Sequence, residues 1–258
     1  MMIFVGDYPG RWCGEGAGKT GGVSDPLAPL LRLEGVPSAF TAARDGIDAL
    51  LRDRGLRRTS PEQTADALLL GAHASAVLEG STASLDDVRA GVGDEVAADA
   101  VRVSVHLLSL VPTLRTAPLQ AFARLHALAS GEEDSGRPRD AGSLARLQAL
   151  GRLLGETTSA PALMVAAVVH ADLATAAPFP SHNGIVARAA ERLLWVTRGV
   201  DERSVLVPEA GHLAHRAAYE SNLRAYRDGG PAGVHAWLRY AAEAAAAGAE
   251  ASPLARGQ

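Results

Sequence analysis

The chain has one cysteine, few aromatic residues and a single lysine. Because Cys13 is the only cysteine, the sequence excludes an internal disulfide and a metal site built from several thiolates. Aromatic residues make up only 4% of the 258 residues, so the core has to consist mainly of leucine, alanine and valine. Alanine and leucine favour helices over strands. Lys19 is the only lysine among 25 basic residues, which indicates the codon usage of a GC-rich, bacterial genome.

An excess of positive charge and a long apolar run are also missing. The net charge is −4 and no basic stripe is present, so nucleic acid is not an expected partner. The most apolar stretch, Ala162–Val169, is closed by His170 and Asp172, and no apolar run reaches the length of a membrane span. The first residues lack the pattern of a signal peptide. These observations predict a cytoplasmic protein with no membrane partner.

The remaining composition is that of a globular protein. Hydrophobic residues make up 47% and charged residues 21% of the chain, which is typical of a folded domain. We expect one domain over residues 25–248, a glycine-rich arm over residues 1–24 and a flexible tail over residues 249–258.

The glycine-rich arm contains part of a P-loop pattern, Gly18-Lys19-Thr20. A complete P-loop has a glycine five residues before Gly18, where this chain has Cys13. A P-loop also continues into a helix, which Gly21-Gly22 disfavours. The sequence therefore favours a mobile arm over a nucleotide-binding loop.

Helix signals fill the chain after residue 25, and no convincing alternating strand pattern appears. Ser60, Pro61 and Gln63 form a capping box that starts a helix ending near Glu79, and Ser84 and Asp94 can cap the next two. Further helices are expected over residues 96–110, 118–129, 144–154, 162–176, 184–197, 209–226 and 234–247. Because residues 162–176 are apolar on every side, this helix should be central in an all-α fold.

The loop Ala177–Gly184 joins the central helix to the next one. Its two prolines and its Asn-Gly pair predict a rigid, sharply turned connection. It opens onto a helix N-terminus, which can hold an anion, and Arg188 lies one turn further along. Taken alone, the loop favours an ordinary corner with Arg188 on a solvated face.

The segment from His170 to Leu194 resembles the core motif of the Fic (Fido) family. There, an alanine-rich helix with an early histidine leads into a loop of pattern His-Pro-Phe-x-Asp-Gly-Asn-Gly-Arg-x-x-Arg. The matching positions in this chain are His170, Pro178, Phe179, Asn183, Gly184 and Arg188. The resemblance implies an all-α Fic domain, a family activity of AMP transfer from ATP with Mg²⁺, and a phosphate site at Asn183, Gly184 and Arg188.

A second segment resembles the inhibitory motif of the same family, Ser/Thr-x-x-x-Glu-Gly/Asn. It comprises Ser75, Glu79 and Gly80, and the first two residues lie four apart on one helix face. The resemblance implies that this helix packs on the domain and that Glu79 pairs with Arg188. Parts of residues 119–128, 136–137, 219–223 and Trp237 also match family features, so the resemblance covers about residues 36–240.

Four departures fall inside the loop motif. Ala177 stands at the position of the histidine that acts as general base, a role worth roughly 10²–10⁴ in rate. Ser181 replaces the aspartate that carries Mg²⁺, and a neutral hydroxyl is a poor ligand for that ion. Ile185 replaces an arginine that contacts the phosphates, and His182 replaces a glycine. His182 is either a displaced base or, as we favour, a half-exposed loop histidine.

Two further observations concern accessory elements. Active relatives carry a β-hairpin flap before the helix near Leu144, but residues 136–143 leave no room for one, so the flap should be reduced or absent.

His212 and His215, with Glu209 nearby, have a spacing that can chelate zinc. No third ligand is evident, so the sequence favours two surface histidines and no metal site.

These departures predict a catalytically degenerate Fic protein without catalytic residues of the family type. It would act as an interaction module for an unknown protein partner or as a weak binder of a nucleotide or phosphate ligand, with no cofactor. The alternative is an active transferase of AMP or another phosphate-containing group, which uses ATP with Mg²⁺ and non-standard residues such as His182.

Overall fold

The computed structural model describes residues 25–53, 59–132 and 135–255. Every regular element in these ranges is a helix, so the all-α prediction is confirmed. The elements are η1 (Ala28–Arg32), α1 (Val36–Asp53), α2 (Pro61–Leu78), α3 (Leu85–Ala90), α4 (Glu95–His106), η3 (Leu107–Leu110), α5 (Val111–Thr116), α6 (Pro118–Ser130), α7 (Ala141–Gly155), α8 (Ala162–Ala176), α9 (Asn183–Thr197), α10 (Pro208–Ala214), α11 (Arg216–Asp228) and α12 (Gly230–Glu250).

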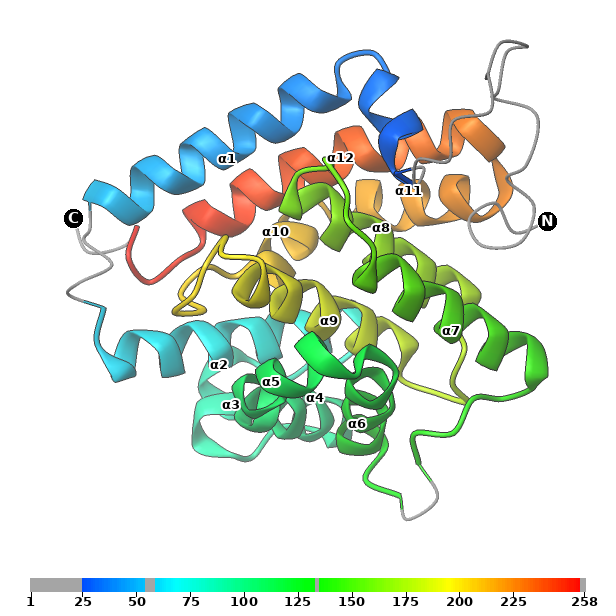
Figure 1. Ribbon diagram of the computed structural model, residues 1–258. Coiled ribbons are helices and arrows are strands. Elements are labelled where there is room, and N and C mark those ends of the chain that lie inside the picture. Colours follow the sequence, from blue (N-terminus) through cyan, green and yellow to red (C-terminus); the bar gives the residue numbers. More distant parts are fainter. Residues whose placement is uncertain (1–24, 54–58, 133–134, 256–258) are drawn as a thin grey trace, which may run out of the picture.

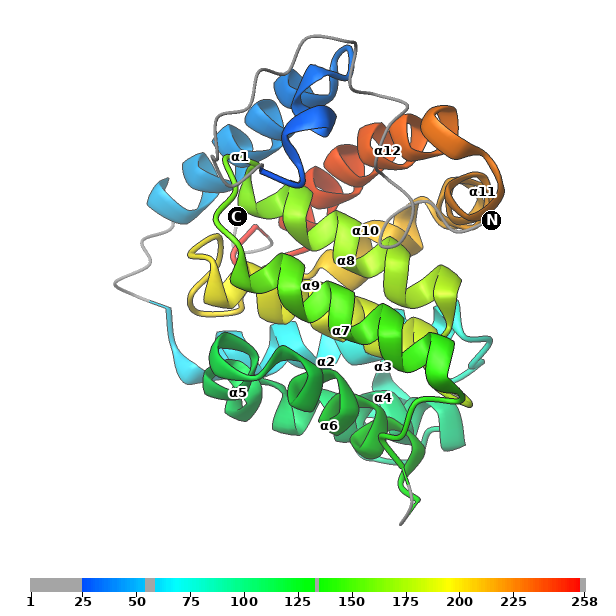
Figure 2. The same cartoon turned by 45° about the vertical axis from the view of Figure 1, so that its right-hand side comes forward.

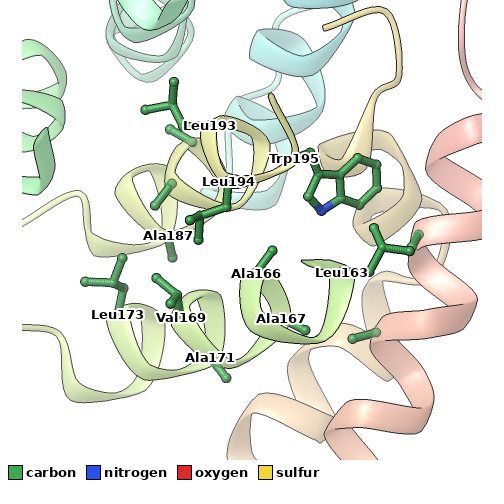
Figure 3. Packing of buried hydrophobic residues seen from close by; sticks show 14 of the residues in the cluster. Leu163, Ala166, Ala167, Val169, Ala171, Leu173, Ala187, Leu193, Leu194 and Trp195 are labelled. Atoms are coloured by element: carbon green, nitrogen blue, oxygen red, sulfur yellow. The ribbon is translucent and has the colours of Figure 1, made fainter. Parts of the chain in front are cut away.

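The helices α8 and α9 form the centre of the molecule, as expected. Leu163, Val169 and Leu173 of α8 pack against Leu194 and Trp195 on the facing side of α9 (Figure 3). Nearly all of α8 is buried, because it has no polar face to present to solvent. Its two charged or titratable residues therefore need partners inside the protein.

The other helices surround this pair in two groups (Figures 1 and 2). On one side α12 lies along α1 and also packs on α8, α10 and α11. On the other side α4 packs between α2 and α6, and all three helices contact α9. Because α2 ends beside the start of α9, the two sequence motifs meet at the centre of the fold.

Side-chain caps fix where several helices begin. The Ser60 hydroxyl accepts from the N–H of Gln63, whose side chain accepts from the N–H of Ser60, so the expected capping box is present. Ser84 forms a second capping box with Asp87 at the start of α3, whereas Asp94 caps α4 by accepting from the N–H of Ala97 alone. Asp140 caps α7, which therefore begins before the predicted residue 144.

Two helices that the sequence predicted as continuous are broken. The expected helix 96–110 is α4 followed by η3, and Pro112 lies in the first turn of α5, where its missing N–H costs nothing. The expected helix 209–226 divides at His215 into α10 and α11. The first of the two, α10, packs closely on α12, since a Cβ on Gly211 would lie 2.0 Å from the carbonyl oxygen of Ala244. The helix α1 was not anticipated.

The ends of the domain differ in part from expectation. The predicted glycine-rich arm, with Gly18-Lys19-Thr20, lies outside the described residues. The predicted flexible tail is wrong as far as Ala255. Ser252 and Leu254 are buried, and the Ser252 hydroxyl donates to the carbonyl of Val205. The hydrophobic core accordingly extends from Leu27 to Leu254.

One described segment meets simple criteria for a membrane span, which corrects the sequence analysis. Glu95–Thr116 is long and apolar enough, with a mean hydropathy of 1.3 over its best window. It comprises α4, η3 and α5, which pack on α2, α6 and α9. Because core helices pass the same test, one such segment is weak evidence for a span. The cytoplasmic location stays a prediction.

Candidate functional site

The loop between α8 and α9 is closed by its own side chains. Asn183 holds Phe179 from both sides: its Oδ1 accepts from the Phe179 N–H at 2.9 Å, and its Nδ2 donates to the Phe179 carbonyl at 2.8 Å. Ala177 and His182 have left-handed backbones with φ of 43° and 56°, which side chains other than glycine adopt at a cost of about 1 kcal/mol. The sharply turned connection is thus present, and Asn183 locks it.

A second segment lies across the outside of this loop. The Arg139 N–H donates to the carbonyl of Pro178 at 2.9 Å, and its guanidinium donates to the carbonyl of Ala176 at 3.2 Å. The described residues between α6 and α7 form turns and contain no strand. This segment therefore covers the α8–α9 loop. It is also the segment in which we expected the β-hairpin flap to be reduced or absent.

Arg188 points inward from the loop and is 1% exposed. Its Nε donates to the Ser75 hydroxyl at 2.9 Å, and Nη2 donates to the Ser75 carbonyl at 3.2 Å and to Glu79 Oε1 at 2.7 Å. Its Nη1 donates to the Tyr219 hydroxyl at 3.1 Å. The predicted contact with Glu79 is present, whereas the interpretation that Arg188 lies on a solvated face is wrong. Four of the five guanidinium N–H groups are used within the protein.

Glu79 lies over the first turn of α9. It follows α2 as the C-cap, and Gly80 with φ of 100° then turns the chain away in a conformation that favours glycine. A Cβ on Gly184 would lie 2.0 Å from Glu79 Oε1, so the carboxylate rests directly against this glycine. The first N–H groups of a helix have no partner within it and attract anions. A carboxylate of the protein itself therefore lies beside the first turn of this helix, between Gly184 and Arg188.

A buried hydrogen-bonded network continues inward from Arg188 through the Tyr219 hydroxyl. His170 Nε2 bonds to this hydroxyl at 3.0 Å, and its Nδ1 bonds to Glu191 Oε2 at 2.6 Å. The same oxygen bonds to His212 Nε2 at 2.8 Å, and His212 Nδ1 bonds to the Tyr240 hydroxyl at 2.9 Å. These contacts join α8, α9, α10, α11 and α12 through side chains alone.

The charges of this network follow from its burial. Burial lowers the pKa of His170 from its ordinary value to about 4, so the imidazole is neutral near pH 7. Burial by itself would raise the pKa of Glu191, but His212 and His170 outweigh it and hold the pKa below its ordinary value. Glu191 is therefore an ionised carboxylate that accepts from two imidazoles.

His170, Glu191 and His212 also have the residue types of a zinc site, with ligand atoms within 4.8 Å of one another. Tetrahedral zinc ligands lie roughly 3.4 Å apart, given metal–ligand distances of about 2.1 Å. The two nitrogen–oxygen distances are instead 2.6 and 2.8 Å, and the other ring nitrogens already bond to tyrosine hydroxyls. The geometry is that of a hydrogen-bonded network rather than a metal centre.

The histidine pair that the sequence weighed as a zinc site is not brought together. His212 is 2% exposed, so its predicted surface position is wrong, whereas His215 is exposed. Glu209 forms a buried ion pair with Arg192, with N–O distances of 2.8 to 3.1 Å. Glu209 and His212 both lie in α10, whereas His215 falls at the break between α10 and α11.

The solvent side of the loop carries a second polar cluster. The Ser181 hydroxyl lies 2.7 Å from His182 Nδ1, and His182 Nε2 lies 3.1 Å from Asp99 Oδ2. On its other side, Ser181 lies 3.5 Å from Nε2 of His126. Asp99 is buried and also accepts from Arg102 at 2.6 and 3.0 Å. The His182 side chain is 25% exposed and Ser181 is half-buried, so this cluster borders solvent.

Comparison with known proteins was informative at the level of structure only. No family model matches the sequence, and no curated protein matches it. Fic-1 from C. elegans has 17% sequence identity and a TM-score of 0.65, over 87% of this chain and 72% of that one. A Fic family protein from Desulfovibrio desulfuricans G20 has 16% identity and a TM-score of 0.63, over 80% of this chain and 73% of that one.

This chain has the Fic fold. Within that fold, the four departures take up definite places. Ala177 begins the loop and offers no titratable group, while Ser181 and His182 bond to each other. Ile185 is buried in the hydrophobic core, so an arginine there would have no access to a ligand without repacking. Asn183 and Gly184 are the first residues of α9 and Arg188 lies further along the same helix, with Glu79 against Gly184 and bonded to Arg188.

Sequence analysis missed several residues of the Fic-fold site. Asp99 was not singled out, although its spacing of three from Arg102 on one helix indicated an ion pair. His126 lies in the segment 119–128, which was noted only for its match to family features, yet its ring stacks on Phe179 with centroids 4.6 Å apart. Glu191 gave no signal, because a lone acid in a helix pattern is usually exposed.

Proposed function

We propose that this chain is a catalytically degenerate Fic-fold protein, a pseudo-AMP-transferase that acts as an interaction module for a protein partner. The main support is that both polar side chains assigned to the phosphates are used inside the fold. Asn183 bonds to the backbone of Phe179, and Arg188 bonds to Ser75, Glu79 and Tyr219. At most weak binding of a phosphate ligand follows, because a ligand would have to displace Glu79.

The residues at the chemical positions support the same proposal. AMP transfer to a hydroxyl needs a base that removes the hydroxyl proton, and Ala177 has none. It also needs stabilisation of charge on the phosphates, for which Mg²⁺ and a carboxylate are suited. Ser181 supplies a hydroxyl in place of the carboxylate, and Ile185 supplies no charge. We therefore propose that neither ATP nor Mg²⁺ is a resident cofactor.

Labelling with an alkyne-tagged ATP analogue tests this proposal. The purified protein, alone and mixed with a cell lysate, is incubated with the analogue in the presence and absence of Mg²⁺. We expect no labelled protein above background, including when Glu79→Gln removes the carboxylate charge. The matched control is Glu220→Gln, an exposed acid paired with Arg216.

The enzymatic alternative predicts a different pattern. Mg²⁺-dependent labelling that disappears in His182→Ala would identify His182 as a displaced base and would contradict the proposal. Labelling that appears only in Glu79→Gln would show that a competent site is held back by the carboxylate.

A further inference from the structure

The polar cluster on the solvent side of the loop has the geometry of a nucleophile, a base and an acid in series. Ser181, His182 and Asp99 are joined at 2.7 and 3.1 Å, within the range of 2.6–3.2 Å that such arrangements show. The serine and the histidine are adjacent in sequence, whereas the acid comes from α4, 83 residues away. A direct contact of this length between distant elements fixes the orientation of the histidine ring.

The hydrogen-bond directions are consistent along the whole series. Because the Asp99 carboxylate can only accept, His182 Nε2 carries a hydrogen and donates it. In a neutral ring Nδ1 is then an acceptor, which leaves the Ser181 hydroxyl to donate to it. Asp99 is in turn held by the guanidinium of Arg102, which also donates to the carbonyl of Leu128. With a neutral His182 ring, these hydrogen-bond directions are the ones that deprotonation of the serine requires.

His126 completes the cluster on the opposite side of Ser181. The Gly136 N–H donates to His126 Nδ1 at 2.8 Å, so the neutral ring carries its hydrogen on Nε2, the atom that faces the Ser181 hydroxyl. Burial and the neighbouring His182 lower the pKa of His126, which keeps this ring neutral near pH 7. A neutral N–H donor beside a nucleophile is suited to a developing oxyanion.

We propose that Ser181 is a nucleophile toward carboxylic esters, with His182 as its base, Asp99 as the residue that positions His182, and His126 as a donor to the oxyanion. This activity differs from phosphoryl chemistry and does not depend on whether the chain binds ATP. It uses the edge of the loop that borders solvent, where Ser181 is half-buried.

The reaction balances with the ester and water alone. Ser181 Oγ forms a bond to the carbonyl carbon while its proton passes to His182 Nδ1, and the carbonyl oxygen takes the negative charge beside His126 Nε2. Collapse breaks the bond to the alcohol oxygen, which leaves with the proton from His182, and the acyl group remains on Ser181. Water then attacks the acyl carbon, gives its proton to His182, and releases the carboxylic acid as Ser181 takes that proton back.

A fluorophosphonate probe tests the nucleophile without knowledge of the natural ester. The full chain is labelled at pH 7.5 and the modified residue is identified by mass spectrometry. We expect labelling at Ser181, its loss in Ser181→Ala, and a rate about 10²–10⁴-fold lower in His182→Gln. Ser221→Ala, an exposed serine whose hydroxyl donates to a helix carbonyl, serves as the matched control and should label like the parent. Folded protein with no label on Ser181 would overturn the proposal.

A cysteine at position 181 tests whether His182 activates the nucleophile or only contacts it. Ser181→Cys is made in a Cys13→Ser background, so that the protein carries one thiol. A neighbouring base raises the thiolate fraction, so iodoacetamide should react at least about tenfold faster at pH 7 than with Ser221→Cys in the same background. Adding His182→Gln should remove this advantage, and Asp99→Asn should reduce it while Asp99→Glu restores part of it. Equal rates with and without His182 would show that the contact only braces the loop.

Discussion

The two sides of the α8–α9 loop use the same residue types and differ in burial. On the inner side, a histidine, an acid and a tyrosine (His170, Glu191 and Tyr219) are fully enclosed, and each ring nitrogen of His170 has a partner. On the outer side, His182 bonds to Ser181 and to a buried acid but keeps a quarter of its side chain exposed. A buried polar group must be satisfied permanently, whereas a half-exposed one can exchange its partner. The inner side is therefore structural, whereas the groups on the outer side can exchange their partners with solvent.

The largest effect expected from this comparison is loss of the inner acid. Glu191→Ala leaves two buried imidazole N–H groups without their shared acceptor, which should lower the free energy of unfolding by roughly 2–6 kcal/mol, at about 1–3 kcal/mol for each unsatisfied donor. Chemical denaturation measures this directly. Glu220→Ala removes an exposed acid paired with Arg216 and should cost about 1 kcal/mol or less. A similar decrease in the free energy of unfolding for both variants would show that the inner network stabilises the fold no more than an exposed ion pair does.

Acid should destabilise the protein through His170. The pKa of His170 is about 4 in the folded state and 6.5 ordinarily. At a pH between these two values, the unfolded chain therefore binds a proton at this residue and the folded protein does not. Stability is then complete above pH 6.5 and falls as the pH drops toward 4, by on the order of 3 kcal/mol. His126 acts in the same direction because its pKa is also lowered.

Denaturation curves between pH 4 and 7.5 measure this dependence. The slope should become smaller in His170→Gln and stay unchanged in His106→Gln, which replaces an exposed histidine. A wild-type stability that is flat across this range would contradict a neutral, buried His170.

The clamp between Glu79 and Arg188 should have an intermediate effect. Arg188 is 1% exposed, whereas the Glu79 side chain is 33% exposed, so solvent screens part of the interaction. We expect Glu79→Gln to lower the free energy of unfolding by about 1–3 kcal/mol, seen as a clear fall in the thermal midpoint. An unchanged midpoint together with newly gained nucleotide binding would instead assign Glu79 an inhibitory role.

The smallest effect on stability is expected on the outer side. His182→Gln should change the free energy of unfolding by about 1 kcal/mol or less, because solvent can replace the lost hydrogen bonds. Thermal unfolding of this variant beside Glu191→Ala sharpens the contrast between the two sides. A loss of several kcal/mol at His182 would show that the outer cluster is structural as well.

Much of the fold could be predicted because its signals are local. The capping box at Ser60 and the uniformly apolar stretch Ala162–Ala176 each determine an element without reference to the rest of the chain. The break at His215 could not be predicted, since the sequence there has neither a proline nor a glycine to end the helix.

The residues of the candidate site could be predicted only within the two segments that resemble Fic-family motifs. The positions of Glu79 and Arg188 followed from two motifs, and their contact is present. Asp99 became part of the site through its contact with His182, 83 residues away, and no periodicity encodes such a pairing. The same holds for the contact between His212 and the Glu191 carboxylate, which arises only because α9 packs against α10.

A calorimetric titration with ATP, with and without Mg²⁺, tests the central claim most directly. That claim is that the fold itself uses Asn183, Arg188 and the start of α9, which leaves nothing to hold phosphates. We predict no measurable heat of binding, or weak binding that Mg²⁺ does not change. Tight, Mg²⁺-dependent binding to the unmodified chain would contradict the claim and would favour an active transferase.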